Sequence, residues 1–393
     1  MGLLKLSWRY LVFHKYKSLI MIACIFLTAF LPIVIAILLN QFNEKIVSRA
    51  DSTPAVIGAK GSKLDLTLHA LYFKNKANNT IPYQTVNEIE QKGWAIPIPL
   101  YSNATAKDFP IVATSLDYFR FRNLQFDQGS DLNTLGDCVL GAAVAKTLDL
   151  KPGDVLLSDR ESVLDIAGKY PLKMNVRGVL APSRSPDDQA VFVDLKTAWI
   201  IEGLGHGHQD LSKEGEDSDS LLGTDGDTKI ANASVLSYTE ITESNIGSFH
   251  FHGDLGEFPI SAIIAVAPDE KNETILQGYF DTANTPAQFA KPNRVVRELM
   301  GLVFQVKKFF DLNAILIAIA TGMMLLLVVV LSLKLREREM QTMFKIGCDR
   351  GAVAMLQLYE LGFIFVIAGS LVAGSVYWVS LYAGEWVQSL LIG

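Results

Sequence analysis

Two histidine pairs are the residues of this chain whose spacing best suits metal chemistry. Among 393 residues there are six histidines, and four of them form two His-x-His motifs. In a β-strand the two histidines of such a motif point to one face, with Cα atoms about 6.5–7 Å apart. Two imidazoles at that spacing can bind one zinc ion. The pairs are His206 with His208 and His250 with His252, and Asp254 follows as a further candidate ligand.

The same histidines also fit an ordinary role as polar residues of loops and strands, because a single His-x-His motif is common by chance. Both pairs border one segment, residues 202–255, that is rich in Gly, Asp, Glu and Ser. This composition predicts a mobile insertion, since it has too few apolar residues to bury a core of its own. No activating glutamate stands at helical spacing beside the pairs, and there is no Ser-His-Asp motif. We therefore expect either a zinc site or unliganded histidines, and no catalytic residues.

Three apolar runs predict helices that cross a membrane. Residues 19–39, 312–333 and 362–382 contain no charged side chain. Each run is about 20 residues long, which is enough for a helix to cross roughly 30 Å of hydrocarbon. The first run is longer than the apolar part of a typical signal peptide, and no cleavage site follows it, so we interpret it as an uncleaved anchor.

Basic residues at the ends of these runs predict the orientation. Residues 1–18 form an amphipathic segment with four basic and no acidic side chains, and the segment 334–361 is also rich in Lys and Arg. Both are therefore expected in the cytoplasm. Five basic residues just before the second span argue the other way, but long translocated domains largely escape this rule. We expect residues 40–311 and the tail, 383–393, to lie outside.

Cysteine content and charge narrow the classes of function. The three cysteines fall in the first span, the external region and the cytoplasmic segment, so an internal disulfide framework is not expected. The net charge of −6 gives no indication of nucleic-acid binding. We expect the partners to be a membrane and other proteins.

Short apolar runs alternate with helical patterns in the external region. This mixture predicts an α+β domain with helices on a face of a sheet. Helices continuing the first two spans would form a stalk beneath the domain. The expected fold class is thus an α-helical membrane domain of three spans plus a large α+β domain inserted between spans one and two. The expected strands are 108–117, 155–159, 173–181, 189–195 and 260–267, the expected helices are 132–150 and 273–283, and the expected stalk segments are 41–50 and 294–311.

The segment between the second and third spans mixes charged residues with an apolar edge. It reads LREREMQTMFKIGCDRGAVAMLQLYELG, a mixture that suits a helix docking into a groove of another protein. An ordinary solvated loop is the alternative. The chain has no G-x-x-x-x-G-K-[ST] phosphate loop. We therefore expect no enzyme activity and no catalytic cofactor here, and any ATPase must be a separate subunit.

Several of these stretches resemble the MacB/FtsX-like ABC transporter permeases. CVLGAAVAKTLDLKPGDVL and NVRGVLAPSRSPDDQAVFVDLKTAW resemble the periplasmic core domain of that family. The segment after the second span resembles its cytoplasmic coupling helix, which implies docking onto a separate ATPase subunit. The family usually has four spans, whereas three are expected here. The residues carried over to ATPase coupling are Arg338, Glu339, Met340, Met343, Phe344, Ile346, Gly347 and Glu360.

The resemblance implies a multi-pass permease of the bacterial inner membrane with a cytoplasmic N terminus and a periplasmic domain. It implies a homodimer working with ATPase subunits and transmitting ATP-driven movement to the periplasm. The histidines favour zinc uptake or handling, with a periplasmic metal-binding or adaptor protein as a further partner. Two alternatives stay open: extrusion of a lipoprotein, peptide or small amphiphile, and an FtsX-like signalling scaffold that activates a periplasmic hydrolase.

Overall fold

The computed structural model divides the chain into two compact units. It describes residues 2–74, 79–160, 170–207, 221–225, 228–231, 239–282, 285–335, 337–345, 347 and 349–392. The helical unit joins Met1–Ile46 to Glu298–Leu390, and the sheet unit is Val47–Arg297 with the last residues, Leu391–Gly393. The sheet unit thus lies, in sequence, between the two segments of the helical unit.

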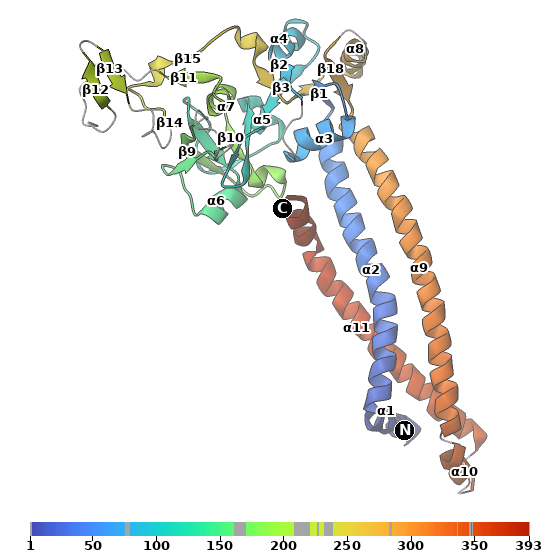
Figure 1. Cartoon of the computed structure of the whole chain (residues 1–393). Coiled ribbons are helices and arrows are strands. Elements are labelled where there is room, and N and C mark those ends of the chain that lie inside the picture. Colours follow the sequence, from blue (N-terminus) through green and yellow to red (C-terminus); the bar gives the residue numbers. More distant parts are fainter. Residues whose placement is uncertain are drawn as a thin grey trace. The chain divides into compact units, whose positions relative to one another are not determined.

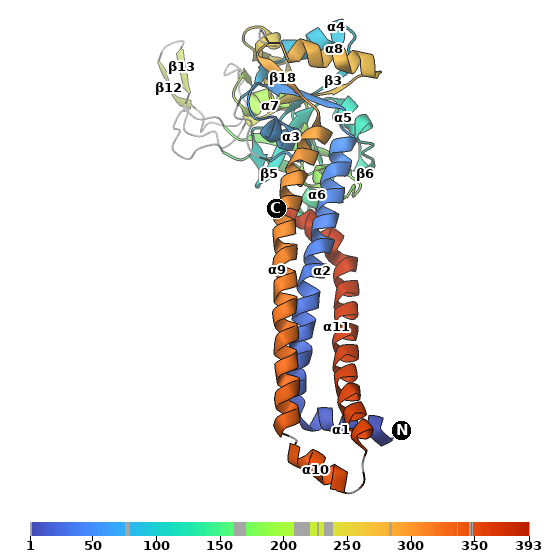
Figure 2. The ribbon, with the colours of Figure 1, turned by 90° about the vertical axis from the view of Figure 1, so that its right-hand side faces the viewer.

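The helical unit contains three long helices, two of which run side by side while the third crosses them at an angle in Figure 1 (Figures 1 and 2). These three are long and apolar enough to cross a membrane, judged by length and composition. A short helix precedes the first of them, and another lies between the second and third. The helices are α1 (Gly2–Phe13), α2 (Lys15–Asp51), α9 (Pro292–Leu335), α10 (Glu337–Lys345) and α11 (Arg350–Ile392).

The predicted apolar runs each lie within one of these long helices. The predicted stalk segments are also helical, since 41–50 belongs to α2 and 294–311 belongs to α9. The expected tail, 383–393, begins as a continuation of α11, which ends at Ile392. Three apolar helices are therefore confirmed, whereas the number of spans and the orientation stay predictions.

The sheet unit is built on a 12-stranded mixed sheet. Nine strands follow the order β14-β9-β7-β10-β5-β3-β17-β1-β18, and β4, β6 and β8 pair beside this path. The strands are β1 (Ala55–Ala59), β3 (Ile96–Tyr101), β4 (Thr105–Ala106), β5 (Phe109–Thr114), β6 (Phe126–Gly129), β7 (Asp137–Leu140), β8 (Val155–Leu157), β9 (Leu172–Leu180), β10 (Val191–Val193), β14 (Thr239–Glu240), β17 (Ala262–Val266) and β18 (Ala287–Ala290).

Six α-helices and three two-stranded ribbons complete the described part of the sheet unit, so the predicted α+β class is confirmed. The helices are α3 (Lys63–Tyr72), α4 (Gln84–Gln91), α5 (Leu116–Phe121), α6 (Ala142–Leu148), α7 (Leu195–Ile201) and α8 (Glu270–Phe280). The ribbons pair β2 (Ile81–Pro82) with β16 (Pro259–Ile260), β11 (Gly205–Gly207) with β15 (Phe249–Phe251), and β12 (Leu221–Asp225) with β13 (Thr228–Ala231). The described residues also form three short 3₁₀ turns, η1 (Pro186–Gln189), η3 (Ile246–Ser248) and η4 (Leu255–Glu257).

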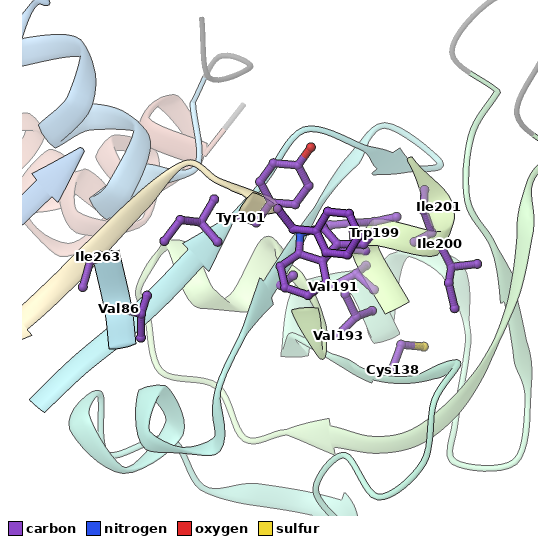
Figure 3. Packing of buried hydrophobic residues seen from close by; sticks show 14 of the residues in the cluster. Val86, Tyr101, Cys138, Val191, Val193, Trp199, Ile200, Ile201 and Ile263 are labelled. Atoms are coloured by element: carbon purple, nitrogen blue, oxygen red, sulfur yellow. The ribbon is translucent and has the colours of Figure 1, made fainter. Parts of the chain in front are cut away.

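Strand β10 and helix α7 belong to the buried core of the sheet unit and precede the first of the clustered histidines in the chain. All three side chains of β10 are buried, because this strand lies inside the sheet. Asp194 then ends the strand and starts α7, since its carboxylate accepts hydrogen bonds from the backbone N–H groups of Lys196 and Thr197. Figure 3 shows Trp199 of α7 in the buried cluster beside Tyr101 and Val191.

The expectation of one helix over 132–150 is wrong. The structure has strand β7 over Asp137–Leu140 and only then helix α6, with Gly141 between them. All four residues of β7 are buried. A short strand buried on both faces shows no alternation, so its periodicity cannot be told from that of a buried helix. The expected strands at 108–117, 155–159, 173–181, 189–195 and 260–267 are confirmed, as is the helix at 273–283.

Candidate metal centre

Three histidines meet on one face of the β11–β15 ribbon. The antiparallel register places His206 directly opposite His250, and His252 follows immediately after β15. One ligand nitrogen from each ring can be chosen so that all three lie within 4.8 Å of one another. The ring centroids are 4.7–5.1 Å apart. The structure thus brings together one histidine of the first predicted pair and both histidines of the second.

The opposite face of the ribbon is apolar, and its glycines make room for phenylalanine rings. Gly205 lies opposite Phe251, and Gly207 lies opposite Phe249. A Cβ atom on Gly205 would lie 2.5 Å from Cε1 of Phe251, and one on Gly207 would lie 2.8 Å from Cε2 of Phe249. Real Cβ atoms essentially never come this close to another heavy atom, so a larger residue at either position would force the opposite ring to move. The two glycines of Gly205–Gly207 therefore leave space for the two rings of Phe249–Phe251.

The two faces of the ribbon have opposite environments. Phe249 and Phe251 pack against the hydrophobic core, whereas His206 and His252 are exposed and His250 is half-buried. Alternation along a strand produces this separation, because successive side chains point to opposite faces. The core holds the ribbon by one face and leaves the imidazoles accessible to an ion from solvent.

The spacing of the imidazole nitrogens fits a single zinc ion. Nε2 of His250 lies 3.2 Å from Nε2 of His252. Two nitrogens at 2.0–2.1 Å from one tetrahedral zinc ion are about 3.3 Å apart. Nδ1 of His250 also lies 3.0 Å from the carbonyl oxygen of Ser248. If Nδ1 donates this hydrogen bond, Nε2 carries a lone pair, which accepts the hydrogen bond from His252 in the absence of metal and would bind the ion in its place.

Of the other two candidate ligands, one is not in the described cluster and the other is not described. His208 lies outside the described residues. Asp254 is exposed, and its Oδ1 accepts a hydrogen bond from the backbone N–H of Gly256 at 2.9 Å, which starts turn η4. Within the predicted insertion, residues 208–220, 226–227 and 232–238 also lie outside the described residues.

Apart from Glu360, the described candidate coupling residues lie on α10 and at Gly347. Arg338 and Phe344 are exposed on this helix, and Met340 is half-buried. Gly347 has a φ of +94°, a conformation that favours glycine and turns the chain between α10 and α11. Ile346 and the side chains of Glu339 and Met343 are outside the described part of the structure.

Glu360 is placed differently from the rest of that set. Its side chain is buried against α2, and its Oε1 lies 3.2 Å from Nζ of Lys17. Close by, the hydroxyl of Ser7 in α1 donates to the carbonyl oxygen of Leu356 at 3.1 Å. Glu360 thus takes part in the packing of α11 on the first two helices of the helical unit.

A buried ionic cluster in the sheet unit was not predicted from the sequence. The Arg49 guanidinium donates to both carboxylate oxygens of Asp187, at 2.8 and 3.0 Å, and to the carbonyl oxygen of Leu71 at 2.6 Å. The Tyr118 hydroxyl donates to Oδ1 of Asp187 at 2.6 Å. Burial raises the pKa of Asp187, but the positive charge of Arg49 and the hydrogen bonds from Arg49 and Tyr118 together outweigh it and lower that pKa to about 2.

The Pro- and Ser-containing sequence of residues 182–188 predicts a surface loop, and this cluster corrects that prediction at its end, since residues 182–184 are exposed but the last two are not. Asp187 and Asp188 are buried, and Ser185 and Pro186 begin turn η1. A Ser-Pro-Asp sequence is typical of a capped helical start, and that was the available signal. No local pattern around Arg49 indicated its role, because its partner Asp187 lies 138 positions away in the sequence.

Comparisons with known proteins give faint likenesses. No family model and no curated protein matches this sequence. Among solved structures, the periplasmic region of MacB from Actinobacillus actinomycetemcomitans is similar with a TM-score of 0.36 and 10% identity, over 65% of this chain and 97% of that one. The extracellular domain of the noncanonic ABC-type transporter YknZ from Gram-positive bacteria is similar with a TM-score of 0.33 and 9% identity, over 61% and 99%. At these scores the likeness carries no argument, so the functional proposal depends on the residues themselves.

Proposed function

We propose that this chain is the permease subunit of an ABC system of the MacB/FtsX-like type, and that its external domain binds zinc for uptake or handling. The observation that carries the metal part is the histidine triad, with two Nε2 atoms 3.2 Å apart on an anchored ribbon. Three long apolar helices and the α+β sheet unit support the membrane part.

The helical unit would couple this domain to ATP hydrolysis in a partner. Helix α10 is short and rich in charge, with Phe344 exposed, which suits docking onto a separate ATPase subunit. In this proposal the chain works as a homodimer in the bacterial inner membrane. Its N terminus and α10 lie in the cytoplasm, and the sheet unit lies in the periplasm, where a metal-binding or adaptor protein would meet it.

The ligand set decides which ions the site would take. Imidazole nitrogens suit Zn²⁺, Cu²⁺ and Ni²⁺, whereas Mg²⁺ and Ca²⁺ prefer oxygen ligands. His206, His250 and His252 would supply three of the four positions of a tetrahedral zinc ion, and water or a further donor would supply the fourth. The residues present therefore fit a borderline transition metal.

Zinc titration calorimetry on the full chain in nanodiscs tests the metal part. We expect one ion per chain with a Kd in the micromolar range or tighter, and no binding of Ca²⁺. The His250→Ala/His252→Ala variant should lose this binding. The matched control is His14→Ala, because His14 lies at the start of the helical unit, outside the triad. Binding that survives the double substitution would overturn the metal assignment and leave extrusion or hydrolase signalling as the functions to test.

Zinc-dependent stimulation of the partner ATPase tests the uptake part separately. We expect zinc to raise ATP hydrolysis by the assembled complex, and His250→Ala/His252→Ala to abolish that rise. Stimulation by a lipoprotein or peptide instead would favour extrusion. Binding of a periplasmic hydrolase by the sheet unit, without transport, would favour the signalling scaffold.

A further inference from the structure

The apolar face of the metal ribbon continues directly into a cluster of aromatic rings. Phe251, which stands between His250 and His252, packs edge-on against Trp199 with ring centroids 6.2 Å apart. Phe251 also contacts Phe258 at 5.8 Å. Trp199 and Phe258 contact each other at 5.0 Å. The residue between two metal ligands is therefore one corner of a closed triangle of rings.

Trp199 connects this triangle to two other elements. It lies in α7 with only 2% of its surface exposed, among the buried residues of Figure 3. Its indole N–H donates to the carbonyl oxygen of Pro259 at 2.9 Å. Pro259 belongs to β16, which pairs with β2 through Pro82 and Ile81. Trp199 thus contacts the metal ribbon, forms part of α7 and holds β16.

A metal ion would act on this cluster through the backbone of β15. An ion bound by His250 and His252 fixes the two residues on either side of Phe251, and His206 ties them to β11. Fixing both neighbours restricts the backbone dihedrals that aim the Phe251 ring. The ring lies against Trp199 in a close-packed core, where a side chain cannot move without moving its neighbours.

We propose that zinc at His206, His250 and His252 is an effector that stabilises α7 and β16 through Phe251 and Trp199. This inference deepens the proposed metal binding and rests on it. If local opening of α7 requires release of the ion, zinc at 100 times its Kd makes that opening ~100-fold rarer. If opening of α7 leaves the ion bound, zinc has no effect on it.

Amide hydrogen exchange of the full chain in nanodiscs, with and without zinc, measures this coupling. We expect slower exchange in β11 and β15, and also in α7 and β16, by up to ~100-fold at 100 times the Kd. Helix α8 serves as the internal control, because it packs on β18 and the ring of its Tyr279 contacts Trp94, which is not one of the three rings of the triangle. Its exchange should not change with zinc.

The Phe251→Leu variant separates coupling from binding. It keeps all three histidines, so calorimetry should give a zinc Kd within a few fold of that of the wild type. The zinc effect on α7 should fall to about 1-fold, while the effect on β15 remains. If Phe251→Leu disrupts the ribbon and loses zinc, Phe258→Leu makes the same test from outside β15.

The outcomes distinguish this inference from the proposal on which it rests. Zinc that binds in calorimetry but leaves α7 exchange unchanged in the wild type overturns the coupling and leaves metal binding intact. A zinc effect on α7 that persists in both leucine variants also overturns it. An absence of zinc binding in calorimetry overturns the metal site and the coupling together.

Discussion

The Arg49 cluster and the histidine triad both join segments that are far apart in the sequence, and they differ in how their polar groups are satisfied. Arg49 and Asp187 are buried, and their hydrogen bonds to each other, Tyr118 and Leu71 are complete within the protein. The triad instead presents three imidazoles on a face open to solvent. The first arrangement stabilises a fold, and the second suits a ligand that arrives from outside.

Removing one partner of the buried pair should have the largest effect on stability. Arg49→Met leaves Asp187 as an unpaired buried charge, and such losses destabilise proteins by about 3–5 kcal/mol. The zinc Kd should not change. Urea unfolding of the full chain and calorimetry would measure both. The double variant Arg49→Met/Asp187→Leu should recover most of the loss, because apolar replacement of both partners is often nearly neutral. A single variant as stable as the wild type would show that this cluster does not hold the fold.

Removing one imidazole should weaken zinc binding strongly and change the stability of the fold little. His206→Ala deletes the only ligand contributed by β11 to the described cluster. We expect zinc affinity to fall more than ~100-fold, since even losing a residue that only orients a ligand costs about 10–100-fold. The free energy of unfolding without zinc should change by less than about 0.5 kcal/mol, because the side chain is exposed. Unchanged affinity would remove His206 from the site.

Acid should separate the two clusters by pH. Zinc should dissociate on acidification, because protons compete with the metal ion for the imidazole nitrogens. The folded-state pKa of Asp187 is about 2, below the ordinary value for aspartate. Its stabilisation, about 2–3 kcal/mol, is therefore complete above about pH 4 and is lost as the pH falls from there to about 2. Calorimetry from pH 8 to 5 and unfolding from pH 7 to 2 would follow each loss. Simultaneous loss of both would contradict the distinction.

A smaller effect should follow from crowding the apolar face of the ribbon. Gly205→Ala places a Cβ 2.5 Å from the Phe251 ring, which must move, at a cost of about 1–3 kcal/mol. Zinc binding should weaken with it. Gly247→Ala is the matched control, because nothing lies within 4 Å of its Cβ position and its φ is not positive. Equal effects of the two substitutions would show that the glycine–phenylalanine pairs do not set the ribbon.

Local patterns predicted much of this architecture. Uncharged runs predicted the three apolar helices, and short apolar runs predicted five strands. Both kinds of segment are visible in the sequence because they have an apolar composition and the hydrophobic periodicity of a helix or strand. The failure at β7 has the same origin, since Asp137–Leu140 is buried on both faces and carries no alternation. The predicted insertion left no pattern for β11, whose three residues contain two glycines.

The histidine pairs were found from spacing, but the contacts that bring them together were not. The sequence offered all four histidines and Asp254 as candidate ligands, whereas the structure groups His206 with His250 and His252. That grouping depends on a register between residues 44 positions apart, which the rings of Phe249 and Phe251 determine by packing on the core. Tertiary contacts of this kind leave no mark on local periodicity. For the same reason, Asp187 could not be identified from the sequence as the partner of Arg49.

The glycine–phenylalanine pairs of the metal ribbon have a consequence for how this region can change over time. Each pair divides a fixed volume between two strands, so enlarging Gly205 is tolerated only if Phe251 becomes smaller. These positions should therefore vary as pairs and exchange volume across the ribbon, while the histidine face between them varies independently. For protein engineering, the ribbon is a short cassette in which one face specifies attachment and the other can be rewritten for a different ion.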